Sequence, residues 1–420
     1  MIDHFTDMVA GSLGLKDPWQ VTGARFDQEL GQVHIYVGVR DGAALPCPRC
    51  GGPTVRYGYE PEERVWRHGD CMFYPTLVHC RRPRVRCDDC GVQQAGAPFE
   101  RKSSRFTLLF EGYAMMLMAD MPRAKVAAAL RCDEKSLSGI LSYWVGRAVS
   151  ARSLEGVTAV AVDETSFKRG HSYVTLAIDA VGRRVIDVEE GRDKAAVERF
   201  AGKLAGKGGD PLKVEAVTSD MSKSYGPAIA EQFPNAEHVI DKFHVKQLVT
   251  SAMDEVRKAE QRAVADKKEL FRSRWLFWVP RRKLTAEQSA DLAALSRRFP
   301  RTGRACRIVA GLDDFYDSRG VEEAEGAFKA LCSWMRRCRL GPMKEAALAL
   351  MRHKEKILAY FKNRLTNAVC EGINSLVQAA KRKARGYRTF AGFAAMIYLV
   401  AGKLELQSPN PFACHPLRLE

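Results

Sequence analysis

The sequence predicts an α/β enzyme domain that follows two small modules, a zinc ribbon and a helix-turn-helix, and contains a helical insertion. Three observations predict this fold class: paired C-x-x-C-G turns near the start, a helix, short helix, turn, helix pattern after them, and alternating strands and helices beyond. The expected domains are an N-terminal region at 1–100 with the ribbon at about 45–93, a helix-turn-helix at 101–152, a catalytic domain at 153–245 and 360–405, a helical insertion at 246–359, and a tail at 406–420.

The composition indicates a globular chain with an anionic partner. Its 420 residues are 46% hydrophobic and carry a formal net charge of +16, with a pI near 9.4. Nucleic acid is the commonest partner of such a chain, and an anionic membrane is the rival explanation. No apolar run approaches the roughly 18 to 20 residues that span a bilayer, and the start lacks the features of a signal peptide. We therefore expect a cytoplasmic protein with no membrane partner.

The two C-x-x-C-G turns predict a structural Zn²⁺ site. Each turn places two thiolates on one tight loop, where a tetrahedral ion can bind both. A cytoplasmic location disfavours disulfides, so metal binding is the expected use of clustered thiols. Between the turns, residues 64–68, 73–79 and 83–86 alternate as short hairpin strands. The expected ligands are Cys47, Cys50, Cys87 and Cys90. The long gap between the turns leaves His68, Cys71, His79 and Cys80 as substitute ligands. The remaining cysteines, expected to be small core residues, are Cys132, Cys306, Cys332, Cys338, Cys370 and Cys414.

The segment after the ribbon has the layout of a helix-turn-helix. A helix is expected from Phe106 to Ala119, a short one from Arg123 to Leu130, and a third after a turn at 131–133. Asp133 or Glu134 would cap the third helix. A plain three-helix bundle would have the same spacing. If the unit binds DNA, the residues at the exposed N-terminal end of the third helix that read base edges are Lys135, Ser136 and Ser138.

Two aspartates follow apolar runs in the expected catalytic domain. Asp163 closes the run at 157–162, and Asp220 closes the run at 214–219. The order β-β-β-α-β-α-β, with the first and fourth strands ending in aspartate, describes a ribonuclease H-like fold, in which those two strands are neighbours. Such aspartates, together with a glutamate on a helix, provide the oxygen ligands that hold two divalent ions for phosphodiester chemistry.

Glu371 is the expected third carboxylate. An apolar stripe at helical spacing continues from Val369 to Ala380, while Glu371, Asn374 and Gln378 fall on the other face. An ordinary amphipathic surface helix is the alternative interpretation. The same face runs into a basic stretch, so the residues expected to track DNA phosphates are Gln378, Lys381, Arg382, Lys383, Arg385 and Arg388.

Four segments resemble one known family. Val162–His171, Thr218–Ser222, Asp241–Lys246 and Thr366–Asn374 are similar to the ISL family of bacterial insertion-sequence transposases, and the resemblance covers nearly the whole chain. That family combines a zinc ribbon, a helix-turn-helix and a ribonuclease H-like domain with an Asp-Asp-Glu (DDE) triad. The resemblance implies that Asp163, Asp220 and Glu371 are this triad and that His244 belongs to a D-x-x-H element beside it.

The resemblance implies a metal-dependent DNA transposase. Asp163 would bridge two Mg²⁺ or Mn²⁺ ions, Asp220 would bind one and Glu371 the other, and His244 would hydrogen-bond a ligand or the scissile phosphate. The partners would be double-stranded DNA, as the terminal inverted repeats and the target, and a second copy of the chain, in a protein associated with the nucleoid. Two alternatives are a transposase-derived DNA-binding regulator without catalysis, against which the intact triad counts, and a structure-specific nuclease of the same fold.

The helical insertion carries an aromatic cluster, Trp275–Trp278. Related enzymes have insertions at this place that are thought to bind DNA ends or to dimerise, and a helical packing module is at least as good an interpretation here. The aromatic cluster would stack on a displaced base or belong to the core.

Overall fold

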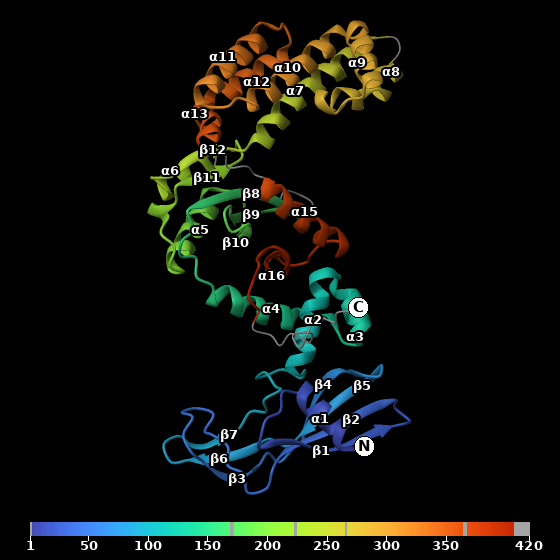
Figure 1. Cartoon of the computed structure of the whole chain (residues 1–420), viewed down its shortest axis with the longest axis vertical. Coiled ribbons are helices and arrows are strands. Elements are labelled where there is room, and N and C mark those ends of the chain that lie inside the picture. Colours follow the sequence, from blue (N-terminus) through green and yellow to red (C-terminus); the bar gives the residue numbers. More distant parts are fainter. Residues whose placement is uncertain (1, 169–171, 222–224, 265–266, 364–367, 407–420) are drawn as a thin grey trace. The chain divides into compact units, whose positions relative to one another are not determined.

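The structure, a computed structural model of the chain, describes residues 2–168, 172–221, 225–264, 267–363 and 368–406. The chain divides into two compact units, one of residues 1–150 with the chain end from 404, and one of residues 151–403 (Figure 1). Nearly all of the expected tail lies outside the described residues. So do parts of three of the four segments that resemble the known family. Among the described helices, none has both the length and the apolar character needed to cross a membrane.

A four-stranded sheet, larger than the hairpins that the sequence predicts, dominates the start of the first unit. Helix α1 (Ile2–Ser12) precedes the antiparallel pair β1 (Trp19–Asp27) and β2 (Gln32–Val39). Strand β2 pairs in parallel with β5 (Tyr74–Cys80), which pairs antiparallel with β4 (Arg64–Cys71). Its core consists of Val9, Leu13, Ile35, Val37, Trp66, Val78, Cys80, Ala97 and Phe99.

The zinc ribbon is a separate three-stranded sheet in the order β3 (Val55–Tyr59), β6 (Pro83–Cys87) and β7 (Gly91–Gln94). The prediction that residues 64–68 and 73–79 form a hairpin between the two turns is confirmed, since β4 and β5 pair antiparallel. This inserted hairpin joins the larger sheet, where Trp66 and Val78 are buried in the core.

Three helices complete the first unit and confirm the predicted order of long, short and long helices. They are α2 (Leu108–Asp120), α3 (Arg123–Leu130) and α4 (Glu134–Ala151). Helix α2 begins slightly later than predicted because the Thr107 side chain accepts a hydrogen bond from the Phe110 amide and caps it.

Five strands form the sheet of the second unit, in the order β10-β9-β8-β11-β12. Neighbours among β8, β9 and β10 are antiparallel, whereas β11 is parallel to both β8 and β12. With two helices, these strands confirm the predicted β-β-β-α-β-α-β order. The elements are β8 (Ala159–Lys168), β9 (Ser172–Asp179), β10 (Arg184–Glu190), α5 (Lys194–Gly206), η1 (Pro211–Lys213), β11 (Ala216–Ser219), α6 (Tyr225–Gln232) and β12 (Glu237–Ile240).

Asp163 was predicted to end this strand, but β8 extends beyond it. It continues to Lys168 because the antiparallel ladder with β9 continues, with Glu164 opposite Thr175 and Thr165 opposite Val174. The apolar run ends at Val162 while the backbone hydrogen bonding does not. Asp163 therefore lies in the middle of a strand and is almost buried.

The rest of the second unit is helical. Helix α7 begins at Lys242, where the Asp241 side chain accepts a hydrogen bond of 2.9 Å from the Phe243 amide. The helices are α7 (Lys242–Ala263), α8 (Lys267–Arg272), η2 (Arg274–Phe277), η3 (Arg281–Lys283), α9 (Ala286–Arg298), α10 (Pro300–Tyr316), α11 (Val321–Arg337), α12 (Gly341–Arg352), α13 (Lys354–Leu358), α14 (Tyr360–Asn363), α15 (Ala368–Lys383) and α16 (Phe390–Ala401).

Helices cover both faces of the five-stranded sheet. Val160 and Val162 of β8 pack in one core with residues of α5 and α6. On the opposite face, Thr165 accepts a hydrogen bond from Gln378 of α15, and the Phe167 ring stacks on Phe393 of α16, 5.6 Å away. Figure 1 shows α15 beside β8. Since residues alternate along a strand, Asp163 points to the same face as Thr165 and Phe167.

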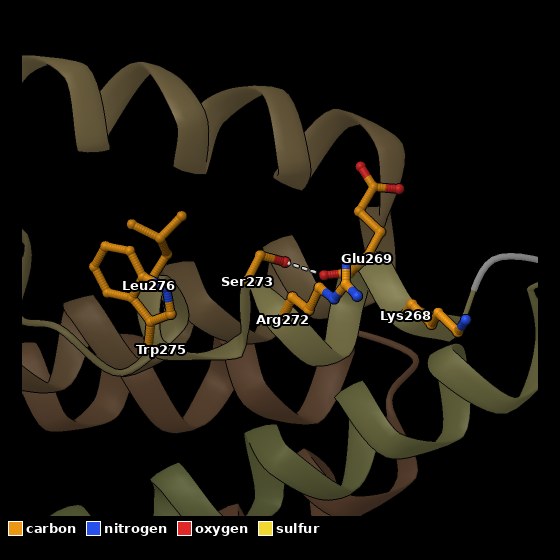
Figure 2. A pocket seen from close by; sticks show the side chains of 6 residues that line it. All are labelled: Lys268, Glu269, Arg272, Ser273, Trp275 and Leu276. Atoms are coloured by element: carbon orange, nitrogen blue, oxygen red, sulfur yellow. Dashed lines mark hydrogen bonds between the residues drawn. The ribbon is translucent and has the colours of Figure 1, made fainter.

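The aromatic cluster of the insertion is only half in the core. Leu276 and Phe277 are buried, but Trp275 and Trp278 are 48% and 50% exposed. They lie on one side because η2 is a 3₁₀ helix with three residues per turn. A pocket of about 500 Å³ lies beside the first tryptophan. Its lining residues, drawn in Figure 2, are Lys268, Glu269, Arg272, Ser273, Trp275 and Leu276.

Candidate functional site

The pairing of β8 with β11 brings the two aspartates together. Ala216 is opposite Ala159, and Thr218 is opposite Ala161. The same offset of 57 positions places Asp220, directly after β11, level with Asp163. Asp163 on β8 and Asp220 just past the end of β11 therefore lie at the same level along two neighbouring parallel strands.

Three groups surround the carboxylate of Asp163. The Glu164 amide donates a hydrogen bond of 2.8 Å to Oδ1, and Asn374 Nδ2 donates one to Oδ2. The Nε2 atom of His244, on α7, lies 3.9 Å from Oδ1 of Asp163 and 3.7 Å from Oδ2 of Asp241. Asp163 thus collects contacts from three elements that are far apart in the sequence.

Helix α15 is fixed to β8 along one face. Besides the bond from Asn374, Gln378 Nε2 donates to Thr165 Oγ1 at 2.6 Å, and Lys381 Nζ donates to Ser166 Oγ at 2.8 Å. Glu371 lies three residues before Asn374, and thus on the same face one turn earlier. Its side chain is exposed.

The pKa shifts of two neighbours show that the carboxylates share one region. Burial, then the charges of Asp163, Asp241 and Glu371, raise the pKa of the Cys370 thiol above its ordinary value. Burial, then mainly the charge of Asp220, raise the pKa of Glu164. Negative charge is therefore concentrated around Asp163, as a cation site requires.

The residues present fit a hard divalent cation. Asn374 Oδ1 is a buried acceptor without a hydrogen-bond partner among the described residues, and it belongs to the amide that contacts Asp163. An amide oxygen among carboxylates is a suitable ligand for such an ion or for its bound water. The ligand oxygens of the three predicted carboxylates do not all lie within 4.8 Å of one another, unlike the sulfur atoms of the four cysteines described below.

The interaction with Asp163 raises the pKa of His244 despite the burial of the imidazole, and the charges of Asp241 and Asp220 act in the same direction. This shift favours the protonated ring, which donates from both nitrogens. His244 can therefore supply a positive hydrogen-bond donor beside the carboxylates.

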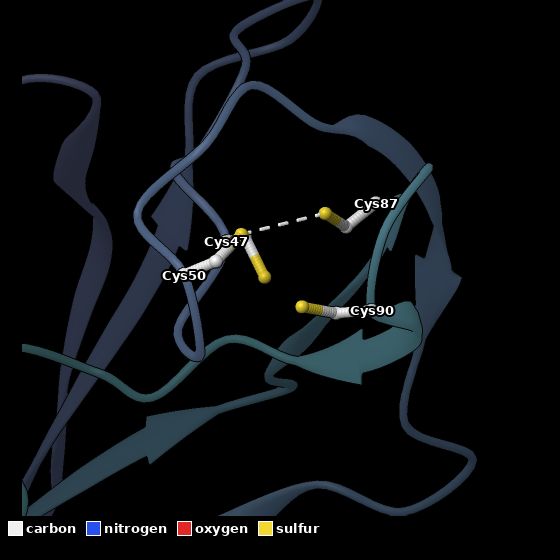
Figure 3. Close-up of side chains that lie close together, drawn as sticks. All are labelled: Cys47, Cys50, Cys87 and Cys90. Carbon is white, nitrogen blue, oxygen red and sulfur yellow. Dashed lines mark hydrogen bonds between the residues drawn. The ribbon is translucent and has the colours of Figure 1, made fainter.

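The four predicted zinc ligands come together. The sulfur atoms of Cys47, Cys50, Cys87 and Cys90 all lie within 4.8 Å of one another (Figure 3). The separation of 3.6 Å between the sulfurs of Cys50 and Cys87 is close to the roughly 3.8 Å expected for two thiolates on one tetrahedral Zn²⁺. Hydrogen bonds from the Cys50 and Arg49 amides lower the pKa of Cys47 to about 7, so this thiol is readily deprotonated.

Three of the four substitute ligands have other surroundings. The His68 ring is 2.8 Å from Thr107 Oγ1, and the His79 ring is 2.8 Å from a Glu63 oxygen. Cys80 is buried in the core, where desolvation raises the pKa of its thiol to about 12. Among the described residues, the paired C-x-x-C turns alone form a thiolate cluster.

The turn before α4 is well defined. Arg131 ends α3 in the left-handed conformation, and Asp133 accepts hydrogen bonds from the amide and hydroxyl of Ser136. Asp133, and not Glu134, therefore caps the helix. Lys135 is exposed, as predicted. The hydroxyl groups of Ser136 and Ser138 are already hydrogen-bonded within the protein, the latter to Glu134 and Arg123.

The predicted DNA track on and after α15 is divided in the structure. Gln378 and Lys381 are half-buried and donate to β8, which the sequence analysis did not foresee. The residues that are exposed are Arg382, Lys383, Arg385 and Arg388. Of the stripe predicted to be buried on α15, Leu376 is 52% exposed. Asn374 was predicted to share the face of Glu371, and its i, i+3 spacing from Glu371 was the signal in the sequence that could have identified it as a site residue.

Comparison with known proteins defines the class of protein as a transposase. The zinc-finger family of the IS204/IS1001/IS1096/IS1165 transposases matches residues 44–90, the helix-turn-helix domain of transposase family ISL3 matches 97–145, and the DDE transposase family ISL3 matches 160–397. The last match alone covers more than half of the chain. The chain therefore belongs to the ISL3 family of transposases, enzymes that cleave DNA and transfer its strands.

Two relatives illustrate the family. The transposase for insertion sequence element IS1557 of Mycobacterium tuberculosis is 25% identical over 379 residues, which are 84% of this chain and 85% of the relative. The transposase for insertion sequence element IS1001 of Bordetella parapertussis is 25% identical over 355 residues, 81% of this chain and 85% of the relative. The match to the DDE transposase family implies the use of divalent metal ions, and the match to the zinc-finger family covers the four clustered cysteines.

Proposed function

We propose that Asp163, Asp220 and Glu371 are the catalytic triad of this transposase, that the bound ions are Mg²⁺ or Mn²⁺, and that its substrates are the inverted repeats at the ends of its own insertion sequence. The observation that supports this most strongly is the register of β8 and β11, which sets Asp220 level with Asp163. The sheet order β10-β9-β8-β11-β12, with β8 central, supports a ribonuclease H-like fold.

The roles of the residues follow from their contacts. Asp163 is the best placed bridging ligand because it is central and already attracts donors from β8, α7 and α15. Asp220 would hold one of the two ions and Glu371 the other. When bound, two divalent ions activate water or a 3′ hydroxyl for in-line attack at phosphorus and stabilise the leaving oxygen. Asn374 keeps Asp163 oriented, and protonated His244 hydrogen-bonds a carboxylate or the scissile phosphate.

The DNA-binding surfaces belong to the same proposal. The exposed N-terminal end of α4 around Lys135 reads base edges, and Arg382, Lys383, Arg385 and Arg388 contact backbone phosphates. Gln378 and Lys381 contribute by holding α15 in place. Pairing of two DNA ends requires at least two copies of the chain, assembled on DNA in the nucleoid.

The test is cleavage of a duplex that carries the DNA flanking the gene, with Mg²⁺ or Mn²⁺ present. Asp163→Asn, Asp220→Asn and Glu371→Gln should each abolish nicking while duplex affinity stays within about twofold. The matched control is Glu355→Gln, on α13. Nicking by any of the three carboxylate variants at the wild-type rate would refute the triad, and a wild-type chain that binds the duplex but never cuts it would support the regulator alternative.

A further inference from the structure

The tip of the β4–β5 hairpin has an unexpected sequence. Cys71 pairs with Tyr74, so Met72 and Phe73 form a two-residue loop. Their φ angles are 48° and 70°, and their side chains are 80% and 91% exposed. Positive φ at both positions is typical of a type I′ turn, for which Asn-Gly is the favoured pair. Met-Phe suits neither this backbone nor water.

Further apolar side chains adjoin the tip. The ring of Tyr74 meets that of Phe26, from β1, edge to face at 4.8 Å. These two rings are 45% and 46% exposed. A strained turn that also exposes large apolar side chains costs stability, and an exposed apolar patch of this kind marks an interaction site.

The hairpin is fixed to the helix-turn-helix. The Arg67 amide donates to the Arg105 carbonyl at 2.8 Å, and the Thr107 amide donates to the Arg67 carbonyl at 3.0 Å. Next to them, the His68 ring lies 2.8 Å from the hydroxyl of Thr107 that caps α2. Strand β4 is thus joined to the chain that enters α2.

The tip itself is held at the turn between α3 and α4. Arg131 Nη2 donates to the Phe73 carbonyl at 2.6 Å and to the Asp70 carboxylate. Arg131 is the residue that ends α3, three positions before α4 begins at Glu134. The tip therefore lies beside the end of α4 that enters the groove in a helix-turn-helix.

The surroundings of the tip suit a polyanion. A pocket of about 580 Å³ at this turn is lined by Arg67, Arg105 and Arg131, together with Asp133. Asp133 and Asp70 pair with these arginines, which leaves one positive charge in excess on this turn. At the exposed start of α4, Lys135 is balanced by its exposed neighbour Glu134, so the excess stays at one positive charge. Apolar side chains that project from a positively charged surface can insert between base pairs of DNA. The cations beside them can then contact the neighbouring phosphates.

We propose that Met72 and Phe73 form a wedge that inserts between base pairs of double-stranded DNA, next to the site contacted by α4, and bends the duplex. The inference rests on the proposed DNA binding by α2–α4. It adds a second contact to that module, one that contributes by unstacking and bending and not by reading base edges.

The variant Met72→Asn/Phe73→Gly tests the wedge without endangering the fold, because it installs the pair that the turn prefers. The probe is a duplex made from the DNA flanking the gene, with a fluorophore at each end, bound to the full chain. The variant should have an unchanged or higher Tm, bind the duplex on the order of 10-fold more weakly, and lose the rise in energy transfer that reports bending. The matched control Val55→Thr, at an apolar residue of the ribbon sheet that is 73% exposed, should behave like the wild type.

Three other results of this experiment would each contradict a specific part of the proposal. Wild-type affinity and bending in the tip variant would overturn the wedge while leaving DNA binding intact. A wild-type chain that does not bind the duplex would instead defeat the proposed function. A wild-type dimer without DNA that the tip variant converts to a monomer, with bending unchanged, would show that the tip contacts a second copy and not DNA.

Discussion

Asn374 Nδ2 donates a hydrogen bond to Oδ2 of Asp163, and this bond joins two residues that are 211 positions apart. One is in the middle of β8 and the other is one turn after Glu371 on α15. The bond therefore fixes the helix that carries the proposed third carboxylate against the strand that carries the first. The oxygen of the same amide, Oδ1, is buried and has no hydrogen-bond partner in the described part of the chain.

Asn374→Ala should weaken metal binding as well as the fold. It removes the donor to a nearly buried carboxylate, which costs about 1–3 kcal/mol of unfolding free energy when an acceptor loses its partner. Mn²⁺ affinity, measured by calorimetry on the full chain, should fall by about 10-fold. Ser375→Ala, at the exposed neighbouring position, is the control. Unchanged Mn²⁺ affinity in Asn374→Ala would remove this residue from the site.

Loss of one thiolate should abolish zinc binding in the ribbon. Cys87→Ser leaves three thiolates for an ion that takes four ligands in structural sites, and the small β3-β6-β7 sheet has little apolar core to replace the metal. Elemental analysis should give about one zinc per wild-type chain and much less in the variant. Cys71→Ser, between the two turns, should keep its zinc; equal losses in both variants would contradict the proposed ligand set.

Stability should fall in acid because of His68. Burial, and then the charge of Arg67, lower the pKa of His68 from 6.5 to about 4. Between these two pH values the unfolded chain binds a proton that the folded chain does not, so stability is lost as the pH falls through this window. The loss is about 3 kcal/mol from this group. The free energy of unfolding should thus decrease less from pH 7 to pH 4 in His68→Gln than in the wild type, and equal slopes would refute the assignment.

The exposed arginines after α15 should contribute to DNA affinity, whereas Lys381 should not. Arg385→Ala/Arg388→Ala should weaken duplex binding and reduce the slope of log affinity against log salt concentration by about 2. Lys381→Met should leave that slope unchanged and lower the Tm, since its ammonium group is bonded to Ser166. A reduced slope for Lys381→Met would show that it leaves β8 to contact DNA.

The order of the elements in the second unit was predictable because Val, Ile and Ala runs alternate with helical patterns there. The end of β8 was not, since Glu164 and Thr165 stop the apolar run although β9 still pairs with them. The four-stranded sheet was missed for a similar reason. Strand β1 has no fully buried residue, so its sequence lacks the pattern of a strand that covers a core.

In the candidate sites too, some features were predictable from the sequence and others were not. The zinc ligands were predictable because each C-x-x-C turn is local and the structure needs only to bring two turns together. The partner of Asn374 was not, because no local pattern shows which strand a helix face will meet. Likewise, Gln378 and Lys381 have the composition of a DNA-binding face, and only their contacts with β8 reveal that they serve packing.

Helices α7 to α14 separate Asp220 from Glu371 in the chain, and this has a consequence during protein synthesis. A ribosome has synthesised both aspartates well before it reaches α15, so a chain that terminates within the insertion lacks the third carboxylate. Under the proposed assignment, such a product is incapable of breaking the chromosome, even though its zinc ribbon and helix-turn-helix are complete. The position of the insertion thereby delays endonuclease competence until α15 has been synthesised.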